Sequence, residues 1–143
     1  MATQSYQNHT RRVPGFLAVG LILFLTFIGG GVNLYRSIGD HQRLYSAALV
    51  LVLTACVFAI GIFARTFALK AQDRAIRAEE SIRHFILTGK PLDSRLEPRQ
   101  IVALRFASDD EFPGLAVRAA RQNLKLDEIK RLVKYWRADT HRV

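Results

Sequence analysis

The chain has 143 residues and a net charge of +9, with half of its residues hydrophobic and 23% charged. This length suits one modest domain, and the single cysteine, Cys56, excludes an internal disulfide. The charges are unevenly distributed: none occurs from Val13 to Tyr35 or from Leu44 to Ala64, whereas the rest of the chain is rich in them. The composition therefore predicts an apolar first part and a charged second part.

Residues 1–12 end in an arginine pair, Arg11 and Arg12, directly before the first apolar run. Such a pair resembles an export signal. Signal peptides usually have an apolar run of about 7–15 residues and a small-residue cleavage site, and this run is longer and lacks an A-x-A pattern. We therefore expect a retained membrane anchor, preceded by a short cytoplasmic segment.

Residues 13–64 are predicted to form a transmembrane helical hairpin, with spans at 13–35 and 44–64 and an outer loop at 36–43. A bilayer core is about 30 Å thick, so roughly 20 apolar residues in a helix cross it. A soluble hairpin is the alternative. It is disfavoured because too little chain remains to cover two helices that are apolar on every side.

Small residues are expected to decide how closely these spans approach a neighbouring helix, since lipid is as apolar as their larger side chains. They either pack the two spans together or receive a helix of another protein. The spans contain no ionisable residue, which argues against ion transport by this chain alone. The predicted packing residues are Gly20, Gly29, Gly30, Gly31, Ala48, Ala55, Ala59 and Gly61.

The flanking cations predict the orientation of the hairpin. The loop 36–43 contains Arg36 and Arg43, whereas many more Lys and Arg residues precede the first span and follow the second. Both termini are therefore expected in the cytoplasm of a bacterium, with the hairpin in the inner membrane. The cations expected to contact lipid headgroups are Arg11, Arg12, Arg65 and Lys70.

Residues 65–143 are predicted to form a cytoplasmic helical domain. No Pro or Gly separates Phe63 from Phe85, so the second span should continue as one long helix until Gly89 and Pro91 stop it. One face of this helix carries apolar residues at spacings of three and four. We call this face the long-helix stripe: Phe67, Ala71, Ala75, Ala78, Ile82 and Phe85.

Three shorter helices are predicted next, in "EPRQIVALRFA", "SDDEFPGLAVRAARQN" and "DEIKRLVKYWRAD". Pro98 suits the first turn of the first one. Ser108 and Glu111 have the spacing of a capping box for the second, and Asn123 should end it in a left-handed turn. The apolar faces of these helices can close over the long-helix stripe as a small cap, or each can bind another protein.

No motif for catalysis, cofactor binding or metal binding is present, so the sequence predicts no catalytic, cofactor-binding or metal-ligating residue. The four histidines are scattered, and His84 lies one turn after Glu80, which we interpret as a surface pair. The acids Asp109, Asp110 and Glu111 are interpreted as the start of a helix, because no further metal ligands accompany them.

Several segments, including "ALKAQDRAIRAEE", "RQIVALRFASD" and "YWRADTHRV", resemble a family of small bacterial membrane proteins of unknown function. The resemblance covers nearly the whole chain outside the apolar runs. It implies an integral membrane protein with two spans and a helical tail, and it implies no activity or cofactor.

The sequence thus predicts an all-α membrane protein that is not an enzyme and acts as an accessory, scaffold or assembly subunit. Its expected partners are membrane lipids and either a second copy or other integral membrane proteins. The alternative is a membrane-tethered regulator whose basic tail binds nucleic acid. In that case Arg99, Gln100 and Arg105 are the candidate contacts, although the preceding Glu97 would repel phosphates.

Overall fold

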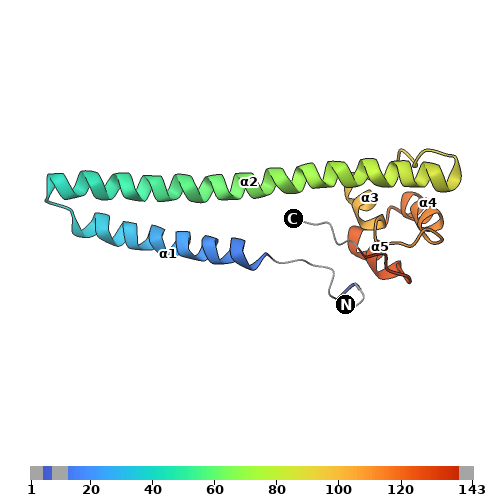
Figure 1. Ribbon diagram of the computed structural model, residues 1–143, viewed down its shortest axis with the longest axis horizontal. Coiled ribbons are helices and arrows are strands. Elements are labelled where there is room, and N and C mark those ends of the chain that lie inside the picture. Colours follow the sequence, from blue (N-terminus) through green and yellow to red (C-terminus); the bar gives the residue numbers. More distant parts are fainter. Residues whose placement is uncertain (1–4, 8–12, 139–143) are drawn as a thin grey trace. The chain divides into compact units, whose positions relative to one another are not determined.

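The computed structural model describes residues 5–7 and 13–138, and in this part of the chain it contains five α-helices and no strand beyond one isolated bridge, between Ala107 and Trp136. The prediction of an all-α protein is therefore confirmed for the described residues. The helices are α1 (Pro14–Arg36), α2 (His41–Thr88), α3 (Pro98–Leu104), α4 (Phe112–Gln122) and α5 (Leu126–Leu132), as labelled in Figure 1.

The chain divides into two compact units, and α2 contributes residues to both. The described part of the first, which we call the apolar unit, covers residues 13–68. The second, which we call the tail unit, contains residues 69–138 together with 5–7.

In the apolar unit, α1 ends one residue later and α2 begins three residues earlier than the predicted spans, so only residues 37–40 connect the two helices. Arg36 is the last residue of α1, so the outer loop is shorter than the expected 36–43. Asp40 explains the early start of α2: its Oδ1 accepts hydrogen bonds from the backbone N–H groups of Gln42 (3.1 Å) and Arg43 (3.2 Å), two donors with no partner inside the helix.

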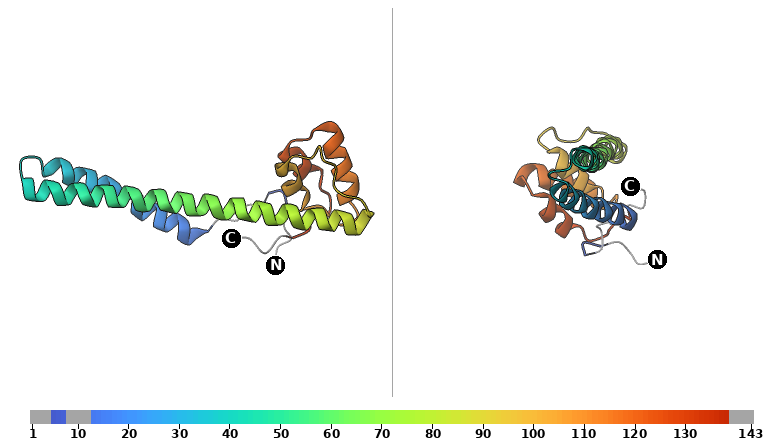
Figure 2. Two further views of the ribbon diagram at one scale, coloured as in Figure 1. Left: turned by 90° about the horizontal axis from the view of Figure 1, so that it is seen from above. Right: turned by 90° about the vertical axis from the view of Figure 1, so that its left-hand side faces the viewer.

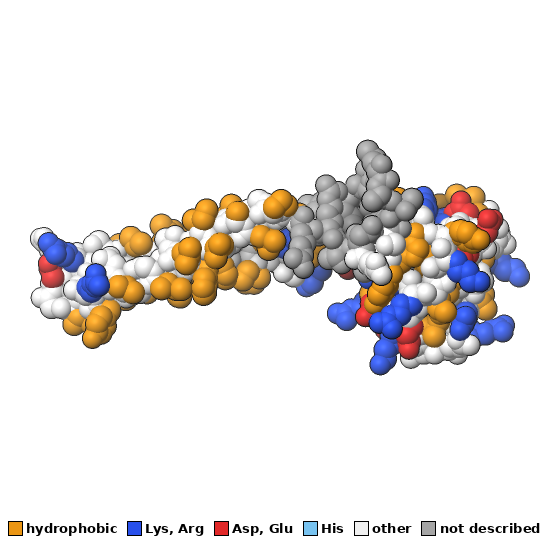
Figure 3. Space-filling view, turned by 90° about the horizontal axis from the view of Figure 1, so that it is seen from below, with side chains coloured by type: hydrophobic (Ala, Val, Ile, Leu, Met, Phe, Trp, Pro, Cys, Tyr) orange, Lys and Arg blue, Asp and Glu red, His pale blue; other side chains and the backbone are white. Residues whose placement is uncertain are grey.

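Most side chains of the apolar unit are exposed. The most apolar windows of α1 and α2 have mean hydropathies of 2.2 and 2.7, and only 6% and 11% of their residues are buried. Figure 3 shows hydrophobic side chains along the visible face of this unit. Both helices are therefore long enough and apolar enough to cross a membrane.

Helix α2 is continuous over 48 residues, as expected from the absence of Pro and Gly after Phe63. It ends at Thr88, and Gly89 adopts a left-handed conformation with φ of 69° while its N–H donates to the carbonyl of Phe85 at 2.8 Å. The predicted stop at Gly89 and Pro91 is confirmed. Glycine adopts this conformation without a steric cost.

The three short helices of the tail unit pack around one hydrophobic core, and Figure 2 shows them gathered beside the last turns of α2. Trp136 lies beyond α5 and packs on Phe106, with 4.8 Å between the ring centroids. The predicted apolar faces of the second and third short helices therefore do close on one another. The largest fully buried side chains are Phe106, Phe112, Leu104 and Ile129.

The predicted capping box at the start of α4 is wrong. Helix α4 begins at Phe112, and the Ser108 hydroxyl is buried with no hydrogen-bond partner among the described residues. The Glu111 carboxylate instead accepts hydrogen bonds from the backbone N–H groups of Lys134 and Tyr135, each at 3.2 Å. Glu111 thus fixes the segment after α5, a tertiary contact that the spacing of Ser108 and Glu111 does not reveal.

The other predicted helix ends agree with the structure. Pro98 occupies the first turn of α3, and Asn123 ends α4 in a left-handed conformation with φ of 47° and ψ of 48°. These are local preferences of the residue types, so tertiary contacts did not override them.

Candidate functional site on the second helix

Within the tail unit, α2 buries a side that carries polar groups. Ile76, Glu80 and His84 are buried, whereas Ile82 and Phe85 of the long-helix stripe are 61% and 57% exposed. The interpretation that the other helices close over the long-helix stripe is therefore wrong. The contacts of α2 with the rest of the tail unit lie instead on the side that carries Arg83 and His84, both of which meet Phe112 at the start of α4.

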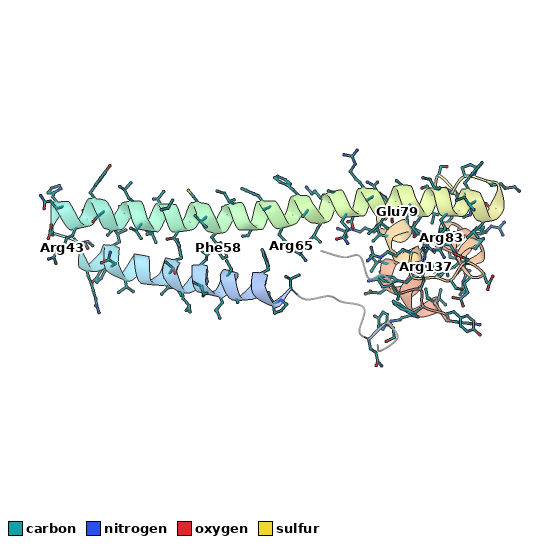
Figure 4. The ribbon with its side chains drawn as sticks, viewed as in Figure 1. Arg43, Phe58, Arg65, Glu79, Arg83 and Arg137 are labelled. Carbon is teal, nitrogen blue, oxygen red and sulfur yellow. The ribbon has the colours of Figure 1, made fainter. Side chains whose placement is uncertain are left out.

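Arg83 is the main polar connection between α2 and the rest of the tail unit (Figure 4). Its side chain is only 11% exposed, and its Nη1 atom donates to Glu80 Oε2 at 2.8 Å. Its Nε atom donates to Asp109 Oδ1 at 2.7 Å, and Nη2 donates to the Ala107 carbonyl at 2.8 Å. The guanidinium also lies 4.6 Å from the centre of the Phe112 ring.

His84 connects α2 to the turn that follows it. Its Nδ1 atom lies 2.9 Å from the Lys90 carbonyl oxygen, so Nδ1 carries the proton and donates this hydrogen bond. The ring also meets the edge of Phe112, with 5.7 Å between centroids. The interpretation of Glu80 and His84 as a surface pair is wrong, because both are buried and each binds a different partner.

An open pocket of about 430 Å³ lies beside Arg83, with Glu79, Glu80, Asp109 and Arg137 in its lining. The two carboxylates nearest to Arg83 are already engaged by its guanidinium. In the described part of the chain, no group of three or more His, Cys, Asp or Glu residues is arranged to hold a metal ion. The contacts of Arg83 therefore hold the segment before α4 against α2.

A second open pocket, of about 650 Å³, is strongly basic. We call it the basic groove; it is lined by Lys70, Asp73, Arg74, Arg77, Pro98, Arg99, Val102 and Leu126. Its four cations face one acid, so the groove attracts anions. Of the cations predicted to contact lipid headgroups, Lys70 lines this groove. Arg65 lies 5.7 Å from the centre of the Phe16 ring in the apolar unit, and Arg11 and Arg12 lie outside the described residues.

Among the small residues predicted to pack in the membrane, Gly30 is buried at a close approach to Leu51. A Cβ atom on Gly30 would lie 3.2 Å from Leu51 Cδ1. The positions of Gly20, Gly29, Gly31 and Gly61 are open to an added Cβ atom, and Ala48, Ala55 and Ala59 are half-buried. Ala47 and Thr54, which are not among the predicted packing residues, are buried in the same unit.

Two of the three residues considered for nucleic-acid binding make contacts inside the tail unit. Gln100 is 3% exposed, and its Nε2 atom donates to the Leu124 carbonyl at 2.9 Å and to Asn123 Oδ1 at 3.2 Å. The Arg105 guanidinium lies 4.6 Å from the centre of the Phe106 ring. Only Arg99 of the three is exposed. Gln100 therefore cannot present its amide to a base edge in this fold.

Residues 5–7 and 13–138 thus form an all-helical structure with two helices long enough and apolar enough to cross a membrane. Residues 1–143 match the model of a family described as a family of unknown function (DUF6526), and the chain belongs to this family. Comparisons with curated proteins and with solved structures found no match.

Proposed function

We propose that this protein is a non-catalytic scaffold or accessory subunit of the bacterial inner membrane, which docks on a second copy or on a larger membrane complex. The observation that carries the proposal is the long-helix stripe: it is exposed, and the hydrophobic core of the tail unit contains none of its residues. An apolar helix face left in water is costly, so a protein partner is the simplest occupant.

The apolar unit supports the membrane part of the proposal. A core helix of a soluble protein would bury its apolar side chains, whereas those of α1 and of the first half of α2 are mostly exposed. Hydrocarbon solvates such side chains, and both helices satisfy their backbone groups internally. We infer that α1 and the first half of α2 cross the bilayer as an antiparallel hairpin, in which Gly30 allows α1 to approach Leu51.

The distribution of Lys and Arg residues supports an orientation of the hairpin with its short connection outside the cytoplasm. The short connection carries only Arg36 and Arg43 at its edges, and the Arg43 guanidinium is neutralised by Asp40 at 3.3 Å. The tail unit carries the cations of the basic groove within a few turns of the apolar part of α2. By the positive-inside rule, this distribution of charge supports the proposal that both termini lie in the cytoplasm.

The basic groove supports a role for anionic lipid. Lys70, Arg74 and Arg77 follow the apolar part of α2 along the sequence, and Arg99 of α3 lines the same groove. Juxtamembrane cations gain about 1 kcal/mol each near an anionic leaflet. We propose that headgroup phosphates of the cytoplasmic leaflet occupy this groove, together with Arg65 at the edge of the bilayer.

The test begins with bacterial membranes that contain the full-length chain. The proposal requires the chain to resist alkaline carbonate and to need detergent for extraction. It also requires that a cysteine-specific reagent that cannot cross the membrane labels an Ile38→Cys variant but not a Lys90→Cys variant in intact spheroplasts, since Ile38 is exposed in the connection between α1 and α2. Both labelling variants are made in a Cys56→Ser background, because Cys56 is exposed. A chain that dissolves without detergent overturns the proposal.

Docking is tested by extraction in mild detergent followed by cross-linking. The expected result is one discrete cross-linked species that contains either two copies or one reproducible partner. A variant with Ile82→Ser and Phe85→Ser should lose this species and remain in the membrane. A chain that migrates alone in every detergent, with or without these changes, contradicts the scaffold function.

A further inference from the structure

The long-helix stripe has the spacing of a coiled coil. Ala71, Ala75, Ala78, Ile82 and Phe85 follow one another at intervals of four, three, four and three residues, and Ala68 precedes Ala71 by three. These intervals place Ala68, Ala75 and Ile82 at a positions and Ala71, Ala78 and Phe85 at d positions of consecutive heptads. We call these six residues the seam. A heptad seam of this kind is the face by which one helix packs on another.

No other part of the described chain covers this seam. All six seam residues are exposed, while Ile76, Glu80 and His84 are buried. At 3.6 residues per turn, Glu80 and His84 each lie roughly 160° around the helix from Ile82. The tail unit therefore packs on one side of α2 and leaves the seam open on the other.

We propose that the occupant of this seam is α2 of a second copy of the chain, aligned in parallel and in register. This inference rests on the proposed function, because two copies inserted into one membrane in the same orientation have their α2 helices parallel. A parallel pair in register brings identical heptad positions together, so Ile82 meets Ile82 of the second copy and Phe85 meets Phe85 of the second copy.

Charge complementarity supports the choice of a second copy. Arg74 occupies a g position and Glu79 the following e position, five residues later. In a parallel pair each g residue faces the next e residue of the other helix, so Arg74 of each copy faces Glu79 of the other. Both side chains are exposed, and neither has an ion pair with another residue of the described part.

The residues around the seam also fit a helix partner. Phe67 occupies the g position at the start of the seam and Ile86 the e position at its far end, and they are 63% and 74% exposed. The alanines between them let two helices approach closely, and Ile82 and Phe85 supply the larger buried area. The apolar strip is thus widest at its two ends and narrow at the centre, where Arg74 and Glu79 lie.

The first experiment is disulfide cross-linking of the full-length chain in native membranes, with Cys56→Ser as the background. Ala71→Cys and Ala78→Cys at d positions should each form a disulfide-linked dimer under mild oxidation. Asp73→Cys is the matched control, because Asp73 is exposed on the same helix but at an f position, away from the seam. We expect roughly tenfold more dimer from each seam variant than from the control.

The second experiment exchanges the charges in the Ala78→Cys chain. Arg74→Glu alone and Glu79→Arg alone each replace two attractions by two repulsions and should lower the yield of dimer about tenfold at low salt. The combined Arg74→Glu, Glu79→Arg variant restores the attraction and should restore the yield. Arg74 also lines the basic groove, so rescue by Glu79→Arg separates the seam from lipid binding.

The outcomes separate this inference from the proposed function. The parallel pair is overturned if the seam variants and the Asp73→Cys control give equal yields of disulfide-linked dimer, or if the combined exchange does not restore the yield. If the chain still needs detergent for extraction in that case, the proposed membrane scaffold stands. A chain released without detergent overturns the proposed function and with it the parallel alignment. Trp136 fluorescence, compared with that of the parent chain, verifies that each variant is folded.

Discussion

Arg83 and Asp109 form an ion pair although they lie 26 positions apart in the sequence: Arg83 Nε donates a hydrogen bond to Asp109 Oδ1 at 2.7 Å, and Arg83 Nη2 lies 2.6 Å from the same oxygen. The same guanidinium holds Glu80 Oε2 at 2.8 Å, and the Glu80 side chain is 7% exposed. Arg83 therefore attaches α2 to the segment before α4 and neutralises a buried carboxylate.

Replacement of Arg83 by alanine should lower the free energy of unfolding of the tail unit by about 3 kcal/mol, because it leaves Glu80 buried without a cation. The measurement is urea unfolding of the detergent-solubilised chain, followed by the fluorescence of Trp136, the single tryptophan. Arg74→Ala is the control: Arg74 is exposed, so its removal should change the free energy by no more than about 0.5 kcal/mol. Equal midpoints for the two variants would contradict the role of Arg83.

Two glycines in the tail unit should respond to alanine in opposite directions. Gly89 has φ of 69°, where a Cβ atom is strained, so Gly89→Ala should destabilise the tail unit by about 1 kcal/mol. Gly114 lies in α4 with open space around it, so Gly114→Ala should stabilise by up to about 1 kcal/mol. Thermal unfolding followed by circular dichroism compares the two, and a loss of stability in both would contradict the helix assignment at Gly114.

Gln100 is predicted to be a structural residue. Its Oε1 atom accepts a hydrogen bond from the Glu97 backbone N–H at 2.7 Å, and its Nε2 atom donates to the Leu124 carbonyl. Gln100→Ala leaves both backbone groups without a protein partner and should cost about 2 kcal/mol of unfolding free energy.

Arg99→Ala at the neighbouring exposed position is the control for Gln100→Ala, and it should leave the stability of the tail unit unchanged. The same two variants also examine the alternative function. If the tail bound duplex DNA through Gln100, binding would show a steep salt dependence and Gln100→Ala would relax its sequence preference. We expect neither effect, because the Gln100 amide is buried.

The acid stability of the tail unit should depend on Asp93. Hydrogen bonds from Arg95 lower the pKa of the Asp93 carboxyl from 3.8 to about 2. A carboxyl with a lowered pKa stabilises the fold above the pKa of the unfolded chain and loses this contribution as the pH falls toward the pKa of the folded state. Stability should therefore decline between about pH 4 and pH 2, and Asp93→Asn should remove this part of the decline. The effect is small, since the pair is exposed to solvent, and it should weaken further in high salt.

The comparison with Arg95→Ala isolates the cause of this pH dependence. Arg95→Ala removes the side-chain hydrogen bonds to Asp93 but keeps the backbone N–H that donates to Asp93 Oδ1 at 3.0 Å, so it should flatten the acid limb in part and less than Asp93→Asn does. An acid limb that is unchanged in both variants would show that other carboxylates determine it.

Local sequence determined most of the helical elements of this protein. The lengths of the apolar runs predicted two helices able to cross a membrane, and the absence of Pro and Gly after Phe63 predicted that the second one continues to Thr88. Gly89, Pro98 and Asn123 predicted helix ends because their backbone preferences are properties of the residue itself. The positions of the helices therefore follow from short-range chemistry.

Only the tertiary structure decided which side of α2 faces the core. The periodicity of α2 favoured burial of the long-helix stripe, yet the buried side carries Glu80 and His84. That side can be buried because the nearby Arg83 guanidinium binds Asp109 and the Ala107 carbonyl, so the charged groups there have partners. Hydrophobic spacing identifies an apolar face, but partners distant in sequence determine whether the opposite, polar face can be buried without leaving charges unpaired.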